Sequence, residues 1–306
     1  MNSVLMVSYY FPPFADVSVV RVKKHCKYLP GYDWQPWDIS VDPRYYKDKV
    51  VDYLEDVRHT NIIRIPYFKL PGSTFLVKLF FPIFVAVYTL IKKSLFDAVY
   101  MTGSPFHPFV LTSLFTGIFN IPTVLDFRDS WSTNHGFDGR KPESLIEQVR
   151  EYFSALIEKI SIKFASKVIF STHILQDEYS KVYPGYKNKF TTITNGYDPD
   201  DFLSIKPNKI VEDKSLILTG KFILYTPELV SGLFEALKEI NQLKFIYVGS
   251  EHREIIELAK KHEVEDRVVS IAYQRYSESL DLISGADYAM TTTGLVYGMG
   301  TKIFDY

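Results

Sequence analysis

Short apolar runs rich in β-favouring residues alternate with segments of helical spacing in the first two thirds of the chain. The pattern is typical of parallel strands buried on both faces and joined by right-handed crossover helices. The sequence therefore predicts an α/β fold of the Rossmann type. The predicted strands are residues 4–8, 35–41, 62–65, 97–102, 123–127, 167–171 and 190–194, and the predicted helices are 17–29, 75–91, 109–119, 143–164 and 174–183.

The same alternation restarts after Phe202. Residues 206–213 have the composition of a linker, so we place an N-terminal domain at 1–202 and a C-terminal domain at 203–306. A ligand held in a cleft between the domains is expected. The last helix begins near residue 300 and stops one turn later, so the second domain is expected to be incomplete. Its predicted strands are 215–219, 243–248, 268–271 and 286–290, and its predicted helices are 227–240, 251–262 and 276–283.

Polar residues gather where the central strands of the first domain end. Ser104 and His107 follow the strand at 97–102, while Asp126, Arg128 and Asp129 lie at the end of the next one. In open α/β sheets, ligands bind beyond the carboxyl ends of the strands. We therefore place the chemistry of the first domain here.

Charge and cysteine content narrow the function. The 306 residues carry a net charge of −1, which gives no basic excess for nucleic acid. The single cysteine, Cys26, cannot form an internal disulfide, which favours a reducing compartment such as the cytoplasm. No signal-peptide pattern opens the chain, and neither G-x-G-x-x-G nor the P-loop motif occurs where it would bind a nucleotide.

The stretch from Phe75 to Ile91 is almost wholly apolar, interrupted by Lys78 and followed by Lys92 and Lys93. A spanning helix needs about 20 apolar residues, which this stretch does not provide without interruption. Two interpretations stay open. The segment is a buried crossover helix, or it is a peripheral membrane contact that lies in the interface with its lysines toward anionic headgroups at the inner face of the membrane.

Five segments, in this order, resemble the GT-B retaining glycosyltransferases of family 4, in particular those of cell-surface polysaccharide biosynthesis. They are YYFPP (9–13) with the Val-x-Arg that ends at Arg21, TGSPFHP (102–108), LDFRDSW (125–131), ITNGYDPDDF (193–202) and GTKIFDY (300–306). The family pattern continues beyond this last segment, so the chain looks shortened at its C-terminus.

The resemblance implies a GT-B enzyme that transfers a sugar, with retention of configuration, from a UDP- or GDP-sugar to a glycan or lipid-linked acceptor. It implies no metal and no other cofactor. The acceptor would bind to the N-terminal domain and the donor to the C-terminal domain. The acceptor-side residues are expected to be Phe14, Ser18, Arg21, Ser104, Arg128 and Asp129.

Two residues would carry the catalysis. By resemblance, His107 lies against the donor sugar near its reactive carbon, where a neutral imidazole can bind a hydroxyl or stabilise developing positive charge. The alternative is a structural histidine with satisfied hydrogen bonds. Lys221 matches the first basic residue of a family segment that neutralises the diphosphate; the alternative is a solvated lysine at a strand end.

The remaining donor contacts would come from the last segment. Backbone amides of 298–302 offer N–H groups to a diphosphate, and Asp305 stands where the family has a glutamate for the ribose. Tyr297 replaces the first glutamate of the family's E-x7-E pair. The donor-binding residues are expected to be Gly220, Gly298, Met299, Gly300, Thr301, Lys302 and Asp305.

Other interpretations stay open. Arg128 and Asp129 form either a buried pair or an acceptor contact. Asp198 and Asp200 fit a turn better than a metal site, since Asn, Gly, Asp and Pro surround them. For the whole chain, the alternatives are a catalytically silent GT-B-like protein that binds a nucleotide sugar or a partner, and a nucleotide-sugar epimerase.

Overall fold

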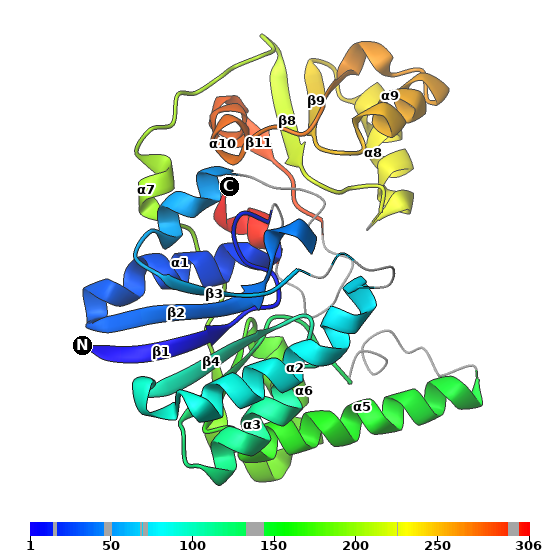
Figure 1. The fold of residues 1–306 in the computed structure, drawn as a ribbon. Helices are drawn as coiled ribbons and strands as arrows, with labels where there is room; N and C mark the ends of the chain where they lie inside the picture. The colour runs from blue at the N-terminus through cyan, green and yellow to red at the C-terminus, as the bar shows by residue number, and fades with distance from the viewer. Residues whose placement is uncertain are drawn as a thin grey trace. The chain divides into compact units, whose positions relative to one another are not determined.

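The computed structural model divides the chain into two compact units, residues 1–194 and 195–306 (Figure 1). It describes residues 1–14, 17–45, 51–67, 69, 73–132, 144–224, 226–292 and 300–306. The sequence predicts the boundary near Phe202, which is the last residue of the short helix α7 (Pro199–Phe202). The structure divides the chain after Thr194 instead, so α7 belongs to the second unit.

The first unit contains a seven-stranded parallel sheet in the order β3-β2-β1-β4-β5-β6-β7. Each strand falls where the sequence predicts one, and the α/β fold class is confirmed. The strands are β1 (Asn2–Val7), β2 (Trp34–Val41), β3 (Asn61–Ile65), β4 (Ala98–Gly103), β5 (Thr123–Phe127), β6 (Lys167–Phe170) and β7 (Phe190–Thr192).

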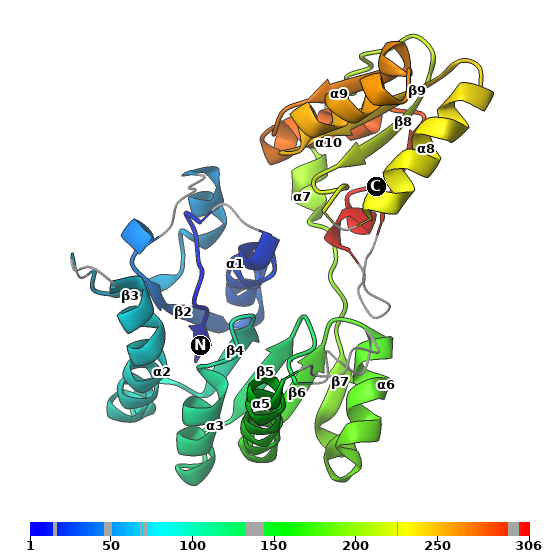
Figure 2. The ribbon, with the colours of Figure 1, turned by 90° about the vertical axis from the view of Figure 1, so that its right-hand side faces the viewer.

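Helices cover both faces of this sheet. Helix α1 (Val20–Tyr28) packs with the 3-10 segment Val51–Val57 on one face. Figure 2 shows α2, α3 and α5 in a row on the opposite face. The bounds on that face are α2 (Ser73–Ile91), α3 (Phe109–Ile118), α5 (Leu145–Phe164) and α6 (His173–Val182). None of the described helices meets the length and hydropathy needed to cross a bilayer.

The strand order fixes where a ligand site belongs in the first unit. Strand β1 pairs with β2 on one side and with β4 on the other, with Val7 opposite Ile39 and Met101. The chain winds outward from β1 through β2 to β3, and then outward from β4 through β5 to β7. The reversal between β1 and β4 is a topological switch point, and open α/β sheets bind ligands beyond the carboxyl ends of the strands at such a point.

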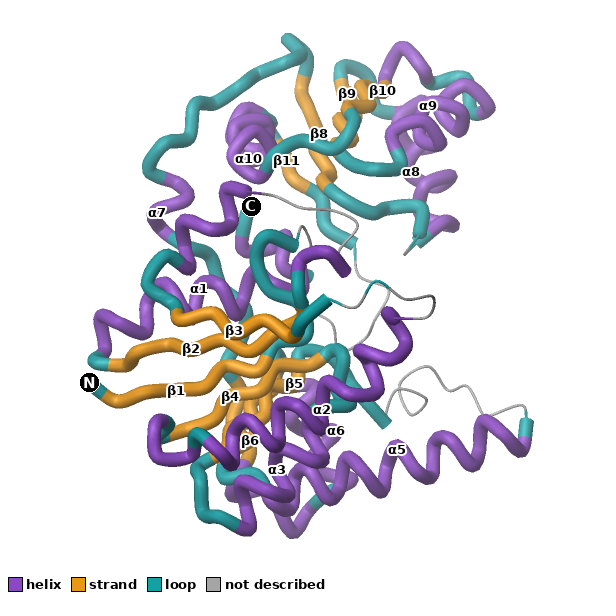
Figure 3. Tube along the Cα trace, in the orientation of Figure 1, coloured by secondary structure: helices purple, strands orange, loops and turns teal. Residues whose placement is uncertain are grey.

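The second unit repeats the plan on a smaller scale. Its four strands pair in parallel in the order β10-β9-β8-β11 and are drawn in orange in Figure 3. Helices α8 and α9 pack on one face around Phe234, Phe245 and Tyr247, and α10 packs on the other against Ile217. The bounds are β8 (Lys214–Thr219), α8 (Pro227–Glu239), β9 (Leu243–Val248), α9 (His252–Lys261), β10 (Val268–Ile271), α10 (Tyr276–Gly285) and β11 (Tyr288–Ala289).

This second sheet also contains a switch point, because β8 has β9 on one side and β11 on the other. The ligand position expected for such a sheet therefore lies beyond Thr219, the last residue of β8. The final segment, expected to begin a helix, forms a 3-10 turn at Thr301–Phe304.

Candidate functional site

At the switch point of the first unit, the loops after β1 and β4 meet through two rings. The ring of His107 packs edge-on against the ring of Tyr9, with centroids 5.5 Å apart. It also packs edge-on against the ring of Phe81 in α2, with centroids 6.2 Å apart. Nε2 of His107 is buried, and no residue in the described part of the chain hydrogen-bonds it. Leaving a buried polar atom unpaired costs on the order of 1–3 kcal/mol, so a structural histidine would not be expected in this state.

The protonation state of His107 follows from its surroundings. Burial and, to a smaller extent, the nearby Lys78 ammonium together lower the pKa of this imidazole to about 4. The ring is therefore neutral at pH 7 and offers one donor and one acceptor nitrogen. A hydroxyl that reached Nε2 would satisfy it without a change of protonation.

The loop that carries His107 is held against the DFRDSW segment (126–131) by aromatic stacking. Phe106 stacks on Trp131, with ring centroids 5.2 Å apart and planes 10° apart. A Cβ atom at Gly103 would lie 2.2 Å from the Phe106 ring, so only glycine allows this contact at the end of β4. The close approach explains the glycine in TGSPFHP.

Arg128 joins three loops rather than facing an open site. Its guanidinium donates to the carbonyl oxygens of Gly103 at 2.6 Å, Ser18 at 2.5 Å and Ser104 at 3.2 Å. The structure thus brings together three residues expected on the acceptor side, with both serines contributing main-chain atoms. Neighbouring Asp129 keeps an exposed surface; partial desolvation raises the pKa of its carboxyl, and the charge of Arg128 opposes that rise.

Arg21, also expected on the acceptor side, takes part in a buried network. Its Nε donates to Oδ2 of Asp126 at 2.8 Å, and its other nitrogens donate to the carbonyl oxygens of Ile193 and Thr194, both at 2.9 Å. The hydroxyl of Tyr100 donates to the same carboxylate at 2.5 Å. Arg21 therefore ties α1 to β5 and to the end of the unit. Phe14, the last expected member, stacks on Tyr10 at 4.7 Å.

In the second unit, Lys302 crosses the carboxyl end of β8. Its Nζ donates to the carbonyl oxygen of Lys221 at 3.3 Å, and its Cε lies 2.9 Å from where a Cβ of Gly220 would be. Gly220 has a φ of +78°, which favours glycine in any case. Burial lowers the pKa of the Lys302 ammonium, and the charges of Glu251 and Asp305 oppose that shift. The Lys221 side chain is exposed.

The residues after Lys302 close the same end of the sheet. Asp305 accepts a hydrogen bond from the Tyr276 hydroxyl at 2.6 Å, and the Tyr306 hydroxyl accepts one from the backbone N–H of Thr219 at 3.2 Å. Burial raises the pKa of Asp305. Gly220, Lys302 and Asp305 thus gather at the switch point, with Gly300 and Thr301 in the same segment. Three positions of the expected site, Tyr297, Gly298 and Met299, lie outside the described residues.

One functional candidate was not identified from the sequence. The carboxylate of Glu251 accepts hydrogen bonds from three consecutive backbone N–H groups, those of Phe222 at 2.7 Å, Ile223 at 2.9 Å and Leu224 at 3.0 Å. It therefore fills an anion-binding turn right after Gly220 and Lys221. Glu251 follows the end of β9, so the strand-end rule applied to the first domain would have found it.

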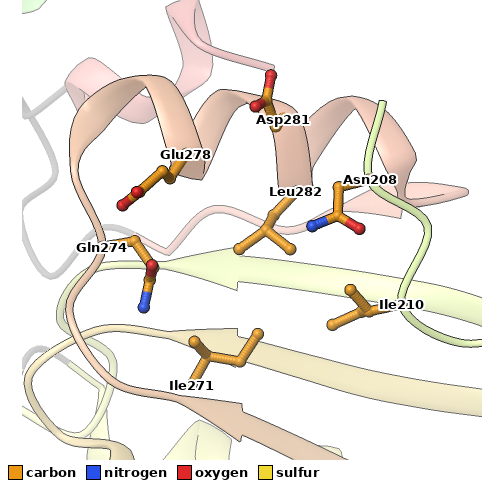
Figure 4. Close-up of a pocket in the computed structure, with 7 residues that line it drawn as sticks. All are labelled: Asn208, Ile210, Ile271, Gln274, Glu278, Asp281 and Leu282. Atoms are coloured by element: carbon orange, nitrogen blue, oxygen red, sulfur yellow. The ribbon is translucent and has the colours of Figure 1, made fainter. Parts of the chain in front are cut away.

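A shallow pocket of about 370 Å³ lies elsewhere in the second unit, between α10 and the segment before β8 (Figure 4). Figure 4 shows Glu278 and Asp281 on α10, with Asn208 opposite. None of the expected site residues lines it. Its lining residues are Asn208, Ile210, Ile271, Gln274, Glu278, Asp281 and Leu282.

The aspartates at 198–201 have a structural role. The Asp198 side chain caps α7 by accepting from the backbone N–H of Asp200 at 3.0 Å. Within the described ranges, no three His, Cys, Asp or Glu side chains gather as metal ligands would.

Comparisons with known proteins identify the fold. No family profile matches the chain, and no curated protein sequence matches it. Among solved structures, HepE of Anabaena in complex with UDP-glucose is 13% identical, with a TM-score of 0.62 over 100% of this chain and 78% of that one. A glycosyltransferase of Rickettsia africae is 15% identical, with a TM-score of 0.62 over 95% and 73% of the two chains. The UDP-GlcNAc 2-epimerase of Neisseria meningitidis bound to UDP-GlcNAc is 12% identical, with a TM-score of 0.54 over 94% and 76%. The chain shares the GT-B fold of these proteins.

Proposed function

We propose that the chain is a glycosyltransferase that moves a sugar from a nucleoside diphosphate sugar to a glycan or lipid-linked acceptor. The observation that carries the proposal is Nε2 of His107 at the switch point of the first unit, which is buried and has no hydrogen-bond partner among the described residues. Fold neighbours solved with UDP-glucose and UDP-GlcNAc support a nucleotide sugar as the donor.

The C-terminal unit binds the donor in this proposal. Lys302 and Lys221 neutralise the diphosphate as point charges, and the absence of a Cβ at Gly220 leaves room for close approach. Asp305, with a pKa raised by burial and held by Tyr276, accepts from or donates to the ribose hydroxyls. The amides of 298–302 add further donors.

The N-terminal unit binds the acceptor and supplies His107. Its imidazole is neutral at pH 7 and can therefore hydrogen-bond a hydroxyl of the donor sugar near the reactive carbon, and it can face the positive charge that develops there. We further propose that the transfer retains the anomeric configuration and needs no metal, as the family resemblance implies. We also propose that the enzyme acts in the reducing cytoplasm, which is consistent with its single, buried cysteine, Cys26.

A second candidate is a catalytically silent protein that binds a nucleotide sugar or a partner. It is favoured by Glu251, whose carboxylate occupies the three N–H groups after β8 and brings negative charge next to the proposed diphosphate position. Tyr297 also favours this second candidate, because the resemblance expects a glutamate at that position.

Labelled UDP- and GDP-sugars separate these functions. The proposal predicts transfer to an added lipid-linked or glycan acceptor, or slow donor hydrolysis without one, in buffer with a metal chelator. Retention is read from the anomeric signals of the product. Donor binding with no turnover supports the silent protein, and a labelled donor converted to its epimer supports an epimerase.

A further inference from the structure

The outward side of α2 carries a row of exposed apolar residues from Phe75 to Ile91. Phe75, Leu79, Ile83, Val87 and Ile91 recur every fourth residue and are between 47% and 71% exposed. Leu76 and Phe80 extend the stripe sideways, and we call these seven residues the α2 face. Residues this far apart on a helix share one side, and the stripe is about 24 Å long at 1.5 Å per residue.

The opposite side of α2 already packs against the first unit. Val77, Phe81, Val85 and Ala86 are almost completely buried, and α2 contacts α3 along its flank (Figure 2). Apart from the exposed Lys78 and the buried Thr89, both the covered and the uncovered side of the described part of α2 are therefore apolar. A helix of this composition is normally buried, so a partner of apolar character is expected on the α2 face.

The charged residues in the chain segment that contains α2 are all positive. Between residues 66 and 96 there is no Asp or Glu, whereas Lys69, Lys78, Lys92 and Lys93 are present in a chain with a net charge of −1. Lys93 lies 5.2 Å above the ring of Phe119, which is itself exposed at the C-terminal end of α3. A partner surface that complements the α2 face and its lysines would therefore be both apolar and anionic.

We propose that the α2 face docks on a bilayer surface rich in anionic lipid, with α2 lying parallel to the membrane plane. The apolar stripe enters the interface between headgroups and acyl chains, and the lysines near both ends of the helix contact the headgroups. Since α2 also places Phe81 and Lys78 beside His107, this docking brings the candidate site of the first unit close to the lipid surface.

Vesicle flotation tests the proposal on the full chain. Phosphatidylcholine vesicles with and without a third of phosphatidylglycerol are compared in low salt and in about 1 M salt, where the Debye length falls to about 3 Å. The chain is expected to float with the anionic vesicles in low salt and to be partly released in high salt. Leu79→Glu with Ile83→Glu is expected to reduce partitioning at least about tenfold, because two charges must enter the apolar layer. Leu229→Glu, at a 50% exposed leucine of α8, is the matched control and should float like the unchanged chain.

A site-specific label provides a second readout that does not depend on a disruptive variant. Cys26 is 1% exposed, so a cysteine placed at Ile83 is the one that a polarity-sensitive dye labels. Its emission should shift to the blue with anionic vesicles, while a dye at Leu229→Cys should not shift. The proposal is overturned if the unchanged chain does not float, if Leu79→Glu with Ile83→Glu floats equally well, or if both labels respond alike. A dimer that this double variant dissociates, without vesicle binding, would assign the face to a second copy instead.

Discussion

Tyr9 and His107 pack edge to face across the switch point of the first sheet, with ring centroids 5.5 Å apart. The pair joins the loop after β1 to the loop after β4, which are far apart in sequence. It leaves Nε2 of His107 buried and, among the described residues, unpartnered. The contact therefore orients a neutral imidazole while keeping one nitrogen for a ligand.

Replacing His107 by Ala is expected to lower sugar transfer by roughly 10²- to 10⁴-fold, because a hydrogen bond and electrostatic support in the transition state are lost. Nucleotide affinity should change little, since the proposed donor contacts lie in the other unit. Initial rates with labelled donor and calorimetry with the nucleotide measure the two effects. His173→Ala, at an exposed histidine of α6, is the control. Unchanged turnover of His107→Ala would refute the assignment.

Replacing Lys302 by Met removes the ammonium while keeping most of the packing over Gly220. The affinity for a nucleoside diphosphate is expected to fall about tenfold or more, because a partly buried cation at the proposed diphosphate position is lost. The matched control is Lys209→Met, at an exposed lysine of the same unit. Equal affinities of the two variants would show that Lys302 does not contact the ligand.

Replacing Asp126 by Ala leaves the Arg21 guanidinium buried without its carboxylate. Breaking a buried pair in this way costs about 3–5 kcal/mol of unfolding free energy. Urea unfolding measures the loss. The exposed pair Arg58–Glu55, with N and O atoms 2.6 Å apart, provides the comparison, and Glu55→Ala should cost no more than about 1 kcal/mol. Similar losses in both variants would contradict the structural role given to Arg21.

Asp38 predicts a pH dependence of stability. Burial in β2 raises the pKa of its carboxyl to about 7, although hydrogen bonds from Ser8 and Ser40 oppose the shift. Between about pH 4 and pH 7 the folded chain holds a proton that the unfolded chain releases, so this group lowers the unfolding free energy as the pH rises through that range. Asp38→Asn should reduce this slope, measured by urea unfolding at several pH values. An identical slope in both proteins would show that Asp38 is ionised in the folded state.

The sequence predicts the strands and most helices because alternating apolar runs and helical spacing are local signals. It also places His107 and Asp126 at strand ends, which needs only the order of the elements. It could not separate Arg128 and Arg21 from ligand-binding arginines. Arg128 follows β5 and Arg21 lies in the first turn of α1, and an arginine at either place has the same local pattern whether it faces a ligand or binds distant parts of the same unit. The role of Glu251 depends on the conformation of the turn at 222–224, which a single sequence does not reveal.

The position of α2 is another feature that the sequence could not fully predict. Its composition left a buried crossover helix and a membrane-interface helix open. The structure shows that it crosses over from β3 to β4 with one side buried and the α2 face exposed. Which side of a helix with apolar residues on both sides is covered depends on the neighbouring helix α3, so hydropathy along the chain could not decide it.

Calorimetric titration of the chain with UDP, GDP and their sugars tests the central claim most directly. The account predicts saturable, one-site binding of one nucleotide class, weakened by Lys302→Met and preserved in His107→Ala. Binding of no nucleotide, or binding that Lys302→Met leaves unchanged, would contradict the proposed donor site in the second unit.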